Sequence, residues 1–483
     1  MSDLRQRAFT SPGRRAAALG AALGAVLLLV GGGMFFGQEA PASNANRTPW
    51  VRRTTTLSTT SVAQRGAPAE KTEVSAVAVH EAPDRTGLLT GSTLSSKPTE
   101  LKITQLGKGA QLSRVTSPIV VSAEGAMATA GSSVIVSDVM ESPGASLSAA
   151  PCLGPATLHW FSGLGATDDD RTDLILTNPD DAQAQVDLRY YGQSGRIAVP
   201  ASSGQVIKGH ASIRVSLNGR VPADGPFSAQ VQATEGRVTA VAKRSQGVSD
   251  WQIPSASPSP IVVIPGIPSD AGRRQLVVTN PGKSRATVGV QVLGFQGPYE
   301  PSGAETLEVS PESTATVSLE KGLGGAAGSI KLTSNVPVTG AVISTSQRRG
   351  AATDLAIQSA AVPLIGSGVS ALATSDSAES ELIVSNAGEA DAQITFEVIS
   401  HDGVTLRTGD MLLGANSTAT RRLNSPAPSY VVVKVPDGSS VFGGVVLTQP
   451  DRREVSGLAT IPLSSPDLAS RAPATRPDYS VGH

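Results

Sequence analysis

The chain has 483 residues, a length typical of three or four domains. Its 39 lysines and arginines nearly balance its 40 aspartates and glutamates, so it lacks the basic excess that nucleic-acid binding requires, and we expect no nucleic-acid partner. The 50 glycines and 33 prolines, with only 8 phenylalanines, 5 tyrosines and 3 tryptophans, favour many short strands joined by tight turns over long helices.

The first predicted element is a hydrophobic helix at residues 16–36. This segment carries no charged side chain. As a helix it would be about 31 Å long, which matches the hydrocarbon core of a bilayer. Arginines precede it at positions 5, 7, 14 and 15, and Arg47, Arg52 and Arg53 lie farther from its other end. Since positive flanks stay inside, we expect a cytoplasmic N-terminus at 1–15, a single-pass transmembrane helix and an extracytoplasmic remainder.

The alternative for this segment is a cleaved signal peptide. Ala40-Pro41-Ala42 and Ser43-Asn44-Ala45 both offer small residues at cleavage spacing. The hydrophobic region of a signal peptide is typically about 7–15 residues, so the greater length here favours an uncleaved anchor. Residues 37–74 are predicted to be an extracytoplasmic linker. Within them the threonine-rich stretch Arg53–Val62 has an edge strand as its alternative.

The strongest signal in the chain is an internal repeat. Three windows of 23 residues align without a gap, at spacings of 102 and 106 residues. They read DLILTNPDDAQAQVDLRYYGQSG at 173–195, QLVVTNPGKSRATVGVQVLGFQG at 275–297 and ELIVSNAGEADAQITFEVISHDG at 381–403.

Each window has the pattern of two strands and the turn between them. A short apolar run ends at Asn178, Asn280 or Asn386, and a proline or glycine then breaks the strand. The strand that follows has apolar residues at every second position, which predicts one buried and one exposed face. These positions are Val186, Leu188 and Tyr190; Val288, Val290 and Val292; and Ile394, Phe396 and Val398.

Further strand-like segments follow each window, giving about seven strands in about 100 residues. We therefore expect an all-β fold with three tandem immunoglobulin-like β-sandwich repeats, at 156–260, 261–363 and 364–466. Residues 75–155 are expected to form a degenerate β unit in which the front half of the repeat is not recognisable. The polar residues 467–483 are predicted to be a disordered tail.

Two parts of the sequence resemble a known family. The stretch CLGPATLHWFSGLG at 152–165 and the windows with an Asn-Pro turn are similar to an actinobacterial family of membrane-anchored extracytoplasmic proteins of unknown function with tandem β-sandwich repeats. The third window departs from this pattern because Ala387 replaces the proline. The resemblance implies a cell-envelope location and an association with envelope glycosyltransferases, and it implies no catalytic residue.

No group of residues predicts catalysis, cofactor binding or metal binding. Asp168, Asp169, Asp170 and Asp173 form one carboxylate cluster, but the glycine and distal glutamate of a helix–loop–helix calcium site are missing, so we expect a solvated loop. The five histidines have no ligand spacing, and surface or turn positions are expected for them. They are His80, His159, His210, His401 and His483.

Two other features have a plain interpretation. Cys152 is the only cysteine, so it forms no intrachain disulfide; we expect a small buried side chain rather than a reactive or intermolecularly paired thiol. Asn46-Arg47-Thr48 and Asn416-Ser417-Thr418 match the glycosylation pattern, and both are interpreted as chance matches in a chain rich in serine and threonine.

These observations predict a non-enzymatic, membrane-anchored cell-envelope protein whose β domains act as a spacer or as a scaffold that docks proteins or glycans. One alternative is an accessory subunit of envelope polysaccharide assembly that partners a glycosyltransferase. The other is a secreted β-domain binding protein with a cleaved leader. Aromatic platforms would support glycan binding, and the candidates are Trp160, Trp251, Tyr190, Tyr191 and Tyr299. The sequence predicts no oligomeric state.

Overall fold

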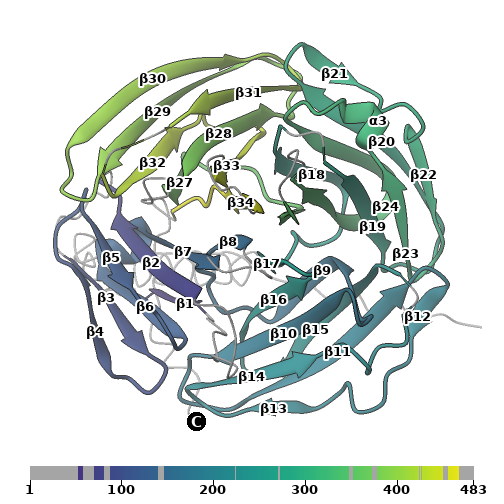
Figure 1. Cartoon of the computed structure of the whole chain (residues 1–483), viewed down its shortest axis with the longest axis horizontal. Helices are drawn as coiled ribbons and strands as arrows, with labels where there is room; N and C mark the ends of the chain where they lie inside the picture. The colour runs from purple at the N-terminus through teal and green to yellow at the C-terminus, as the bar shows by residue number, and fades with distance from the viewer. Residues whose placement is uncertain are drawn as a thin grey trace, which may run out of the picture. The chain divides into compact units, whose positions relative to one another are not determined.

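The computed structural model describes residues 53–57, 70–80, 87–139, 146–223, 225–269, 272–346, 352–372, 378–423, 425, 427–449 and 455–466. Within these ranges almost all regular structure is antiparallel β-sheet, which confirms the predicted all-β class (Figure 1). The two helices described are single turns, α2 (Met127–Ala130) and α3 (Glu320–Leu323).

Several predictions for the two ends of the chain concern residues outside these described ranges. The cytoplasmic N-terminus (1–15), the transmembrane helix (16–36), most of the linker (37–74) and the tail (467–483) lie outside the described residues. None of the helices in the described ranges has the length and apolar character needed to span a membrane.

One strand order occurs four times along the chain. In each unit the first, sixth, third and fourth strands form one sheet, and the fifth, second, seventh and eighth strands form the other. The first unit contains β1 (Arg53–Leu57), β2 (Glu70–Ala78), β3 (Gly87–Thr93), β4 (Pro98–Ile103), β5 (Gly109–Ser113), β6 (Ile119–Gly125), β7 (Gly131–Val139) and β8 (Ser146–Pro151). The second contains β9 (Leu158–Leu164), β10 (Arg171–Asn178), β11 (Ala184–Gly192), β12 (Gly195–Ile197), β13 (Gln205–Ile207), β14 (Ala211–Ser216), β15 (Phe227–Glu235), β16 (Thr239–Ser245) and β17 (Ser249–Gln252).

The third and fourth units follow the same order. The third contains β18 (Ser259–Ile267), β19 (Arg274–Asn280), β20 (Ala286–Gly294), β21 (Gly297–Tyr299), β22 (Thr306–Val309), β23 (Ser313–Ser318), β24 (Gly328–Thr345), β25 (Ala352–Thr353) and β26 (Leu355–Ser359). The fourth contains β27 (Ser367–Ala371), β28 (Glu379–Asn386), β29 (Ala392–Ser400), β30 (Thr405–Leu413), β31 (Ser417–Arg422), β32 (Ser429–Lys434), β33 (Val441–Gln449) and β34 (Val455–Pro462). β12 and β13 share the fourth position in the second unit, and β21 and β22 share it in the third. In the third unit the single strand β24 takes the sixth and seventh positions, and β25 pairs with β34 of the fourth unit.

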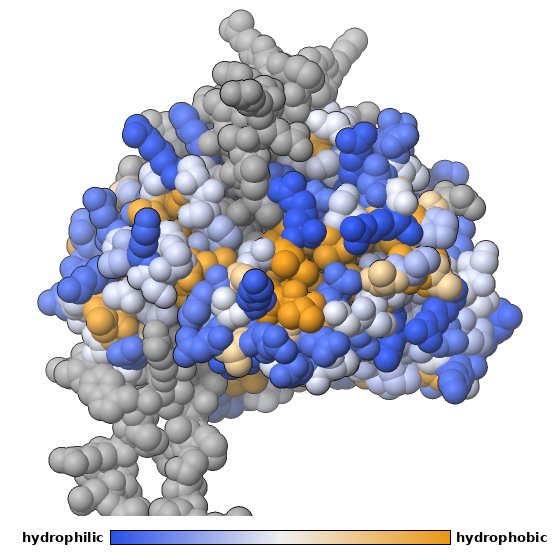
Figure 2. All heavy atoms as spheres, turned by 90° about the horizontal axis from the view of Figure 1, so that it is seen from below, coloured by the Kyte–Doolittle hydropathy of each residue, from blue (hydrophilic) through white to orange (hydrophobic). Residues whose placement is uncertain are grey.

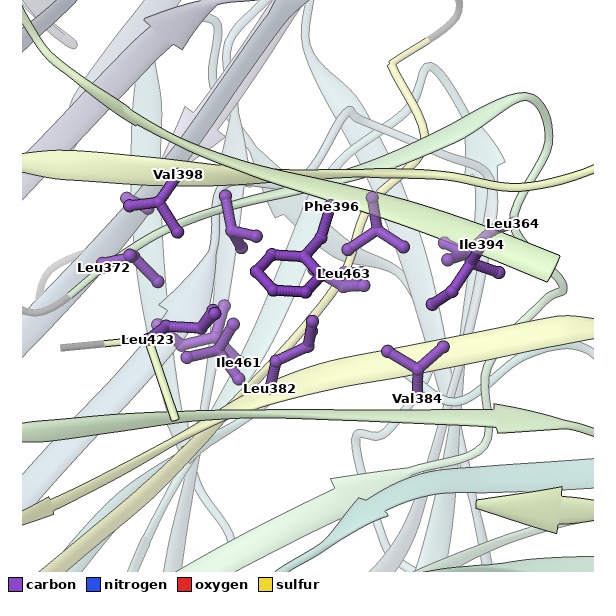
Figure 3. Packing of buried hydrophobic residues seen from close by; sticks show 14 of the residues in the cluster. Leu364, Leu372, Leu382, Val384, Ile394, Phe396, Val398, Leu423, Ile461 and Leu463 are labelled. Carbon is purple, nitrogen blue, oxygen red and sulfur yellow. The ribbon is translucent and has the colours of Figure 1, made fainter. Parts of the chain in front are cut away.

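The two sheets of each unit share one hydrophobic core. In the fourth unit Phe396 of β29 faces Leu382 of β28, with Ile394 and Val398 on either side of it (Figure 3). The alternating residues predicted to be buried in β11, β20 and β29 are buried, which confirms the period-two pattern. Because few aromatic side chains are present, aliphatic side chains fill most of each core.

The asparagine of each repeat window ties the turn to the opposite sheet. Asn280 donates from Nδ2 to the carbonyl oxygens of Ser284 (2.7 Å), Val309 (3.2 Å) and Ser310 (3.1 Å), and its Oδ1 accepts from the N–H of Gly282 (3.0 Å). Asn178 and Asn386 make the same kind of contacts in their units, and all three are buried. The side chain therefore satisfies backbone groups where the chain passes from one sheet to the other.

The first unit differs from the expectation of a degenerate β unit at 75–155. It has all eight strand positions, and β1 and the start of β2 lie within the predicted linker 37–74. β1 is an edge strand, as the alternative for the threonine-rich stretch proposed. Two differences hide the repeat in the first unit. Ala78 takes the place of the asparagine, since it pairs with Gly131 at the end of β2 just as Asn386 pairs with Val441 at the end of β28. In addition, β3 lacks the alternation of aliphatic residues.

Replacing Asn280 by alanine is expected to lower the free energy of unfolding by about 2–4 kcal/mol, because three carbonyl groups and one N–H lose a buried partner. Asn280→Asp should cost at least as much, since it places an oxygen against those carbonyls. Asn335→Ala is the matched control: its exposed side chain accepts one bond from the N–H of Thr287 and donates one to the carbonyl oxygen of Arg285, and since both lie at the surface we expect about 1 kcal/mol or less. Urea unfolding followed by circular dichroism measures all three, and equal losses at the two positions would contradict the assignment.

Candidate functional site

The last strands of the four units meet one another. β8 contacts β17 and β34, and β26 contacts the same two strands. The strands thus form a cycle of contacts that includes every unit. Two carboxylates lie among them, Asp250 on β17 and Asp354 just before β26.

These two carboxylates bind backbone N–H groups of other units. Asp250 accepts from Ala149 of the first unit (Oδ1, 3.4 Å) and from Ile357 of the third (Oδ2, 3.1 Å). Asp354 Oδ2 accepts from Leu147 of the first unit (2.9 Å) and from Leu458 of the fourth (2.8 Å). Together the two side chains connect all four units, and we call them the carboxylate hub.

Burial sets the electrostatics of the hub. Asp250 is 1% exposed and Asp354 is 0% exposed. Burial raises the pKa of Asp250 well above its ordinary value, and the negative charge of Asp354 raises it further, while the N–H groups of Trp251, Ile357 and Ala149 oppose the shift. The hub can therefore hold a proton, and its main chemical role in this arrangement is to satisfy N–H groups at the junction.

The space beside the hub is too small for a substrate. A cavity of about 10 Å³ lies next to it, with Ala149, Trp251 and Ile357 among its mostly apolar lining residues. Such a volume holds about one water molecule. Neither carboxylate lines this cavity.

Away from the hub, hydroxyl groups join the second unit to the third. Thr279 Oγ1 lies 2.8 Å from Ser162 Oγ and 2.6 Å from Ser228 Oγ. Thr314 Oγ1 donates to the carbonyl oxygen of Tyr191 at 2.9 Å and lies 3.0 Å from Ser228 Oγ. All of these hydroxyls are buried, where a donor left without an acceptor costs free energy. The contact is therefore specific, because the two units must bring each hydroxyl to its partner.

The same arrangement joins the third unit to the fourth. Ser329 Oγ lies 2.7 Å from Ser385 Oγ, and Thr418 Oγ1 donates to the carbonyl oxygen of Leu293 at 2.6 Å. Ser329 is opposite Leu293 in the sheet, as Ser228 is opposite Tyr191. One interface design is therefore used twice.

The first and fourth units are joined by a different chemistry at the corresponding positions. Tyr430 is opposite Ile399, where the second and third units have a serine, and its hydroxyl donates to the carbonyl oxygen of Gly107 at 3.0 Å. Its ring packs in a buried cluster with Val77, Val79, Val369, Ile399 and Val432. The N–H of Gly109 donates to the carbonyl of His401 at 2.9 Å, and any side chain at Gly109 would collide with the His401 ring. We call this set the closing contact.

Asp168 and Asp169 of the acidic loop are exposed, as the sequence predicts, but Asp170 is partly buried and has a structural partner. Both oxygens of Asp170 accept from the guanidinium of Arg244, at 2.8 and 2.6 Å, and Arg244 is buried. Asp173 lies 3.9 Å from Arg214. In the ranges that the structure describes, no three His, Cys, Asp or Glu side chains are placed to hold a metal ion. Asp170 thus neutralises a buried arginine.

Four of the five aromatic candidates are inside the protein. Trp160, Trp251, Tyr190 and Tyr191 are buried, and the rings of Trp160 and Tyr191 lie 5.6 Å apart. Tyr299 on β21 is 39% exposed. The buried rings offer no flat face on which a sugar can stack. On the face in Figure 2 hydrophilic side chains predominate, and hydrophobic ones gather near its centre with smaller groups elsewhere.

The histidines and Asn416 have structural surroundings. His80 is exposed, and His210 Nε2 lies 2.6 Å from Asp181. The expectation of a surface or turn position is wrong for His159, which is buried in β9 against the carbonyl of Val238. His401 is half-buried in the closing contact, and His483 lies outside the described residues, as does Asn46. Asn416 is buried and accepts from Lys331 Nζ at 2.7 Å, so it offers no glycosylation site.

The fold and the hub define an all-β protein built from repeated two-sheet units. The chain belongs to a family of unknown function, DUF5719, whose model matches residues 104–424, more than half of the chain. The match covers all three repeat windows and part of the first unit. Comparison with curated proteins finds no match.

Replacing either hub carboxylate by alanine is expected to lower the free energy of unfolding by about 2–5 kcal/mol, because two N–H groups from other units lose their acceptor. Asp437→Ala, at an exposed turn, is the control and should change stability by less than about 0.5 kcal/mol. Thermal and urea unfolding of the three variants measure this. Hub variants as stable as the Asp437 variant would contradict the role of the hub.

The buried hub also predicts how the free energy of unfolding depends on pH. The pKa of Asp250 is raised above 3.8 in the folded state, so the folded protein binds the proton more tightly than the unfolded chain does. The free energy of unfolding should therefore fall as the pH rises from about 4 through the folded-state pKa of this group. Asp250→Asn cannot ionise and should lose this part of the pH profile. The same slope in both proteins would exclude Asp250 as its source.

Cys152 is half-buried, and burial of its thiol raises the pKa to about 12, although a hydrogen bond with Ser133 opposes the shift. At pH 8 the folded protein should react with a thiol reagent about a thousandfold more slowly than an ordinary cysteine, because the thiolate is the reactive form. Labelling in denaturant should be fast. Rapid labelling of the folded protein, measured by mass spectrometry, would contradict this expectation.

Proposed function

We propose that this chain is a non-enzymatic, membrane-anchored cell-envelope protein whose four two-sheet units act as a docking scaffold. Each unit is one copy of an immunoglobulin-sized β-sandwich module, and residues 16–36 anchor the chain with its N-terminus in the cytoplasm. The hydrophobic segment and its arginine flank support the anchor. The partner is an envelope protein or glycan that contacts the outward surfaces of the units.

The closing contact is the observation that carries the scaffold proposal. In a linear array of domains each unit touches only its neighbours, and the first unit is separated from the last. Here Tyr430 of the fourth unit packs on Val77 and hydrogen-bonds to Gly107 of the first. Contacts that return to the first unit fix all four units relative to one another. That property suits a docking surface better than an extended spacer.

The surroundings of the acidic groups support a non-enzymatic role. Asp250 and Asp354 bind backbone N–H groups, and Asp170 pairs with Arg244. Each of these carboxylates is occupied by a structural partner, which leaves none of them positioned as a general acid or base. The burial of four of the five aromatic candidates counts against the glycan-binding accessory subunit.

The anchor is tested on the full-length chain produced in a bacterial envelope. We expect the intact mass to include residues 1–45 and the protein to stay with the membrane fraction after an alkaline wash, whereas a chain lacking residues 1–37 should be released. A mature protein that begins near Ser43 or Asn46 would favour the secreted alternative.

The scaffold is tested by crosslinking in the same membranes. The wild-type chain should crosslink reproducibly to one envelope partner, and Tyr430→Ala should reduce the yield several-fold, because it removes the ring that holds the first and fourth units together. His210→Ala, at a half-exposed side chain, is the control and should leave the yield unchanged. Equal yields from all three proteins would favour a spacer whose units act independently.

A further inference from the structure

The fourth strand position of the fourth unit has an unusually open edge. β30 runs for nine residues without interruption and pairs with β29 on one side (Figure 1). Within the described part of the chain no strand pairs with its other side. An uninterrupted edge of this length presents a row of backbone N–H and C=O groups that a further strand can bind.

The same position is protected in the other three units. β4 of the first unit begins with Pro98 and carries exposed Glu100 and Lys102. In the second unit the position is split into β12 and β13, of three residues each, and in the third into β21 and β22. Short strands, proline and lysine at an edge are features that prevent strand addition. β30 is nine residues long and contains neither proline nor lysine, and its one irregularity is the extra residue Leu406 in its pairing with β29.

The outward side chains of β30 are apolar at both ends. Leu406, beside the bulge in the pairing with β29, is 42% exposed and Leu412 is 64% exposed. Thr408 and Asp410 lie between them and are exposed. Arg407 is engaged within its own unit, where it donates to the carbonyl of Arg422 at 2.9 Å. The exposed row along the edge is therefore Leu-Thr-Asp-Leu.

This row is complementary to itself in one antiparallel register. With a twofold axis at Gly409, Leu406 lies beside Leu412 of the second copy, and Thr408 lies beside Asp410, where a hydroxyl can donate to a carboxylate. An axis at residue 410 would place two Asp410 carboxylates side by side, and an axis at 408 would place Leu406 beside Asp410. Shifts by a single residue would exchange the two faces of the strand.

We propose that β30 pairs antiparallel with β30 of a second copy of this chain, about a twofold axis at Gly409, and joins two four-stranded sheets into one. Backbone hydrogen bonds along the strands give the affinity, and the two Leu406–Leu412 contacts and the two Thr408–Asp410 contacts fix the register. The pairing does not depend on the membrane anchor, so it holds for an anchored or a secreted chain.

Cysteine crosslinking tests the register directly. Full-length chains with Cys152→Ala and either Thr408→Cys or Asp410→Cys carry different tags and are co-expressed. Mild oxidation should link the two chains, because these positions are opposite each other in the pair. Leu412→Cys alone is the control: its two copies would lie about 20 Å apart and should not link. Absence of the Thr408–Asp410 link in folded protein, or links only to a different protein, would overturn the proposal.

A second measurement tests the contacts without cysteine. The dissociation constant of the full-length dimer in detergent is measured by sedimentation at several concentrations. Leu406→Lys with Leu412→Lys should raise it by about tenfold or more, because two apolar pairs become like-charged neighbours. Val206→Lys on β13, a side chain that is 53% exposed, is the matched control and should leave it unchanged. An unchanged constant for the double variant, or a monomeric wild-type chain, would contradict the pairing.

Discussion

Two buried carboxylates hold this protein together at the place where its four units meet. Backbone N–H groups at a junction of strands need acceptors, because water does not reach them. Asp250 and Asp354 supply those acceptors to Leu147, Ala149, Ile357 and Leu458, which belong to the first, third and fourth units. The carboxylates lose hydration in exchange, so the junction is stable only while all of these partners remain in place.

The interfaces around the hub explain how similar units assemble in one order. Buried hydroxyl groups join the second unit to the third and the third to the fourth, with Thr279 and Ser385 in matching positions. The closing contact replaces this hydroxyl chemistry with the Tyr430 ring, Val77 and the small residue Gly109. If the hydroxyl-lined face of one unit packed against the Tyr430 ring, its hydroxyl groups would be buried without hydrogen-bond partners. The difference therefore ensures that the first unit pairs with the fourth.

The sequence predicts the parts of the fold that depend on local patterns. The period-two alternation in β11, β20 and β29 defines their buried faces, and turn residues mark where each strand ends. The first unit was underestimated because Ala78 replaces the asparagine that marks the other units. The last strand of the second unit, β17, was missed as well: it has only four residues, and much of its environment comes from β8 and β26 of other units.

The hub could not be predicted from the sequence for the same reason. Asp250 and Asp354 are single acids next to short apolar segments, and nothing local distinguishes them from surface residues. Conversely, the clustered acids at 168–173 attract attention, yet Asp170 serves a buried arginine. The role of a charged side chain depends on which distant backbone groups reach it, and those distances arise only when the units pack. A lone acid just before an apolar strand is the one signal that the sequence offers.

The central claim is that the four units form one cooperative body through the hub. Native-state hydrogen exchange measured by mass spectrometry tests it most directly. If the claim holds, segments containing the N–H groups of Leu147, Ile357 and Leu458 will open with one common free energy, and Asp250→Ala will lower that value in the first, third and fourth units together. Separate opening energies for each unit, with the effect of Asp250→Ala confined to the second, would contradict it.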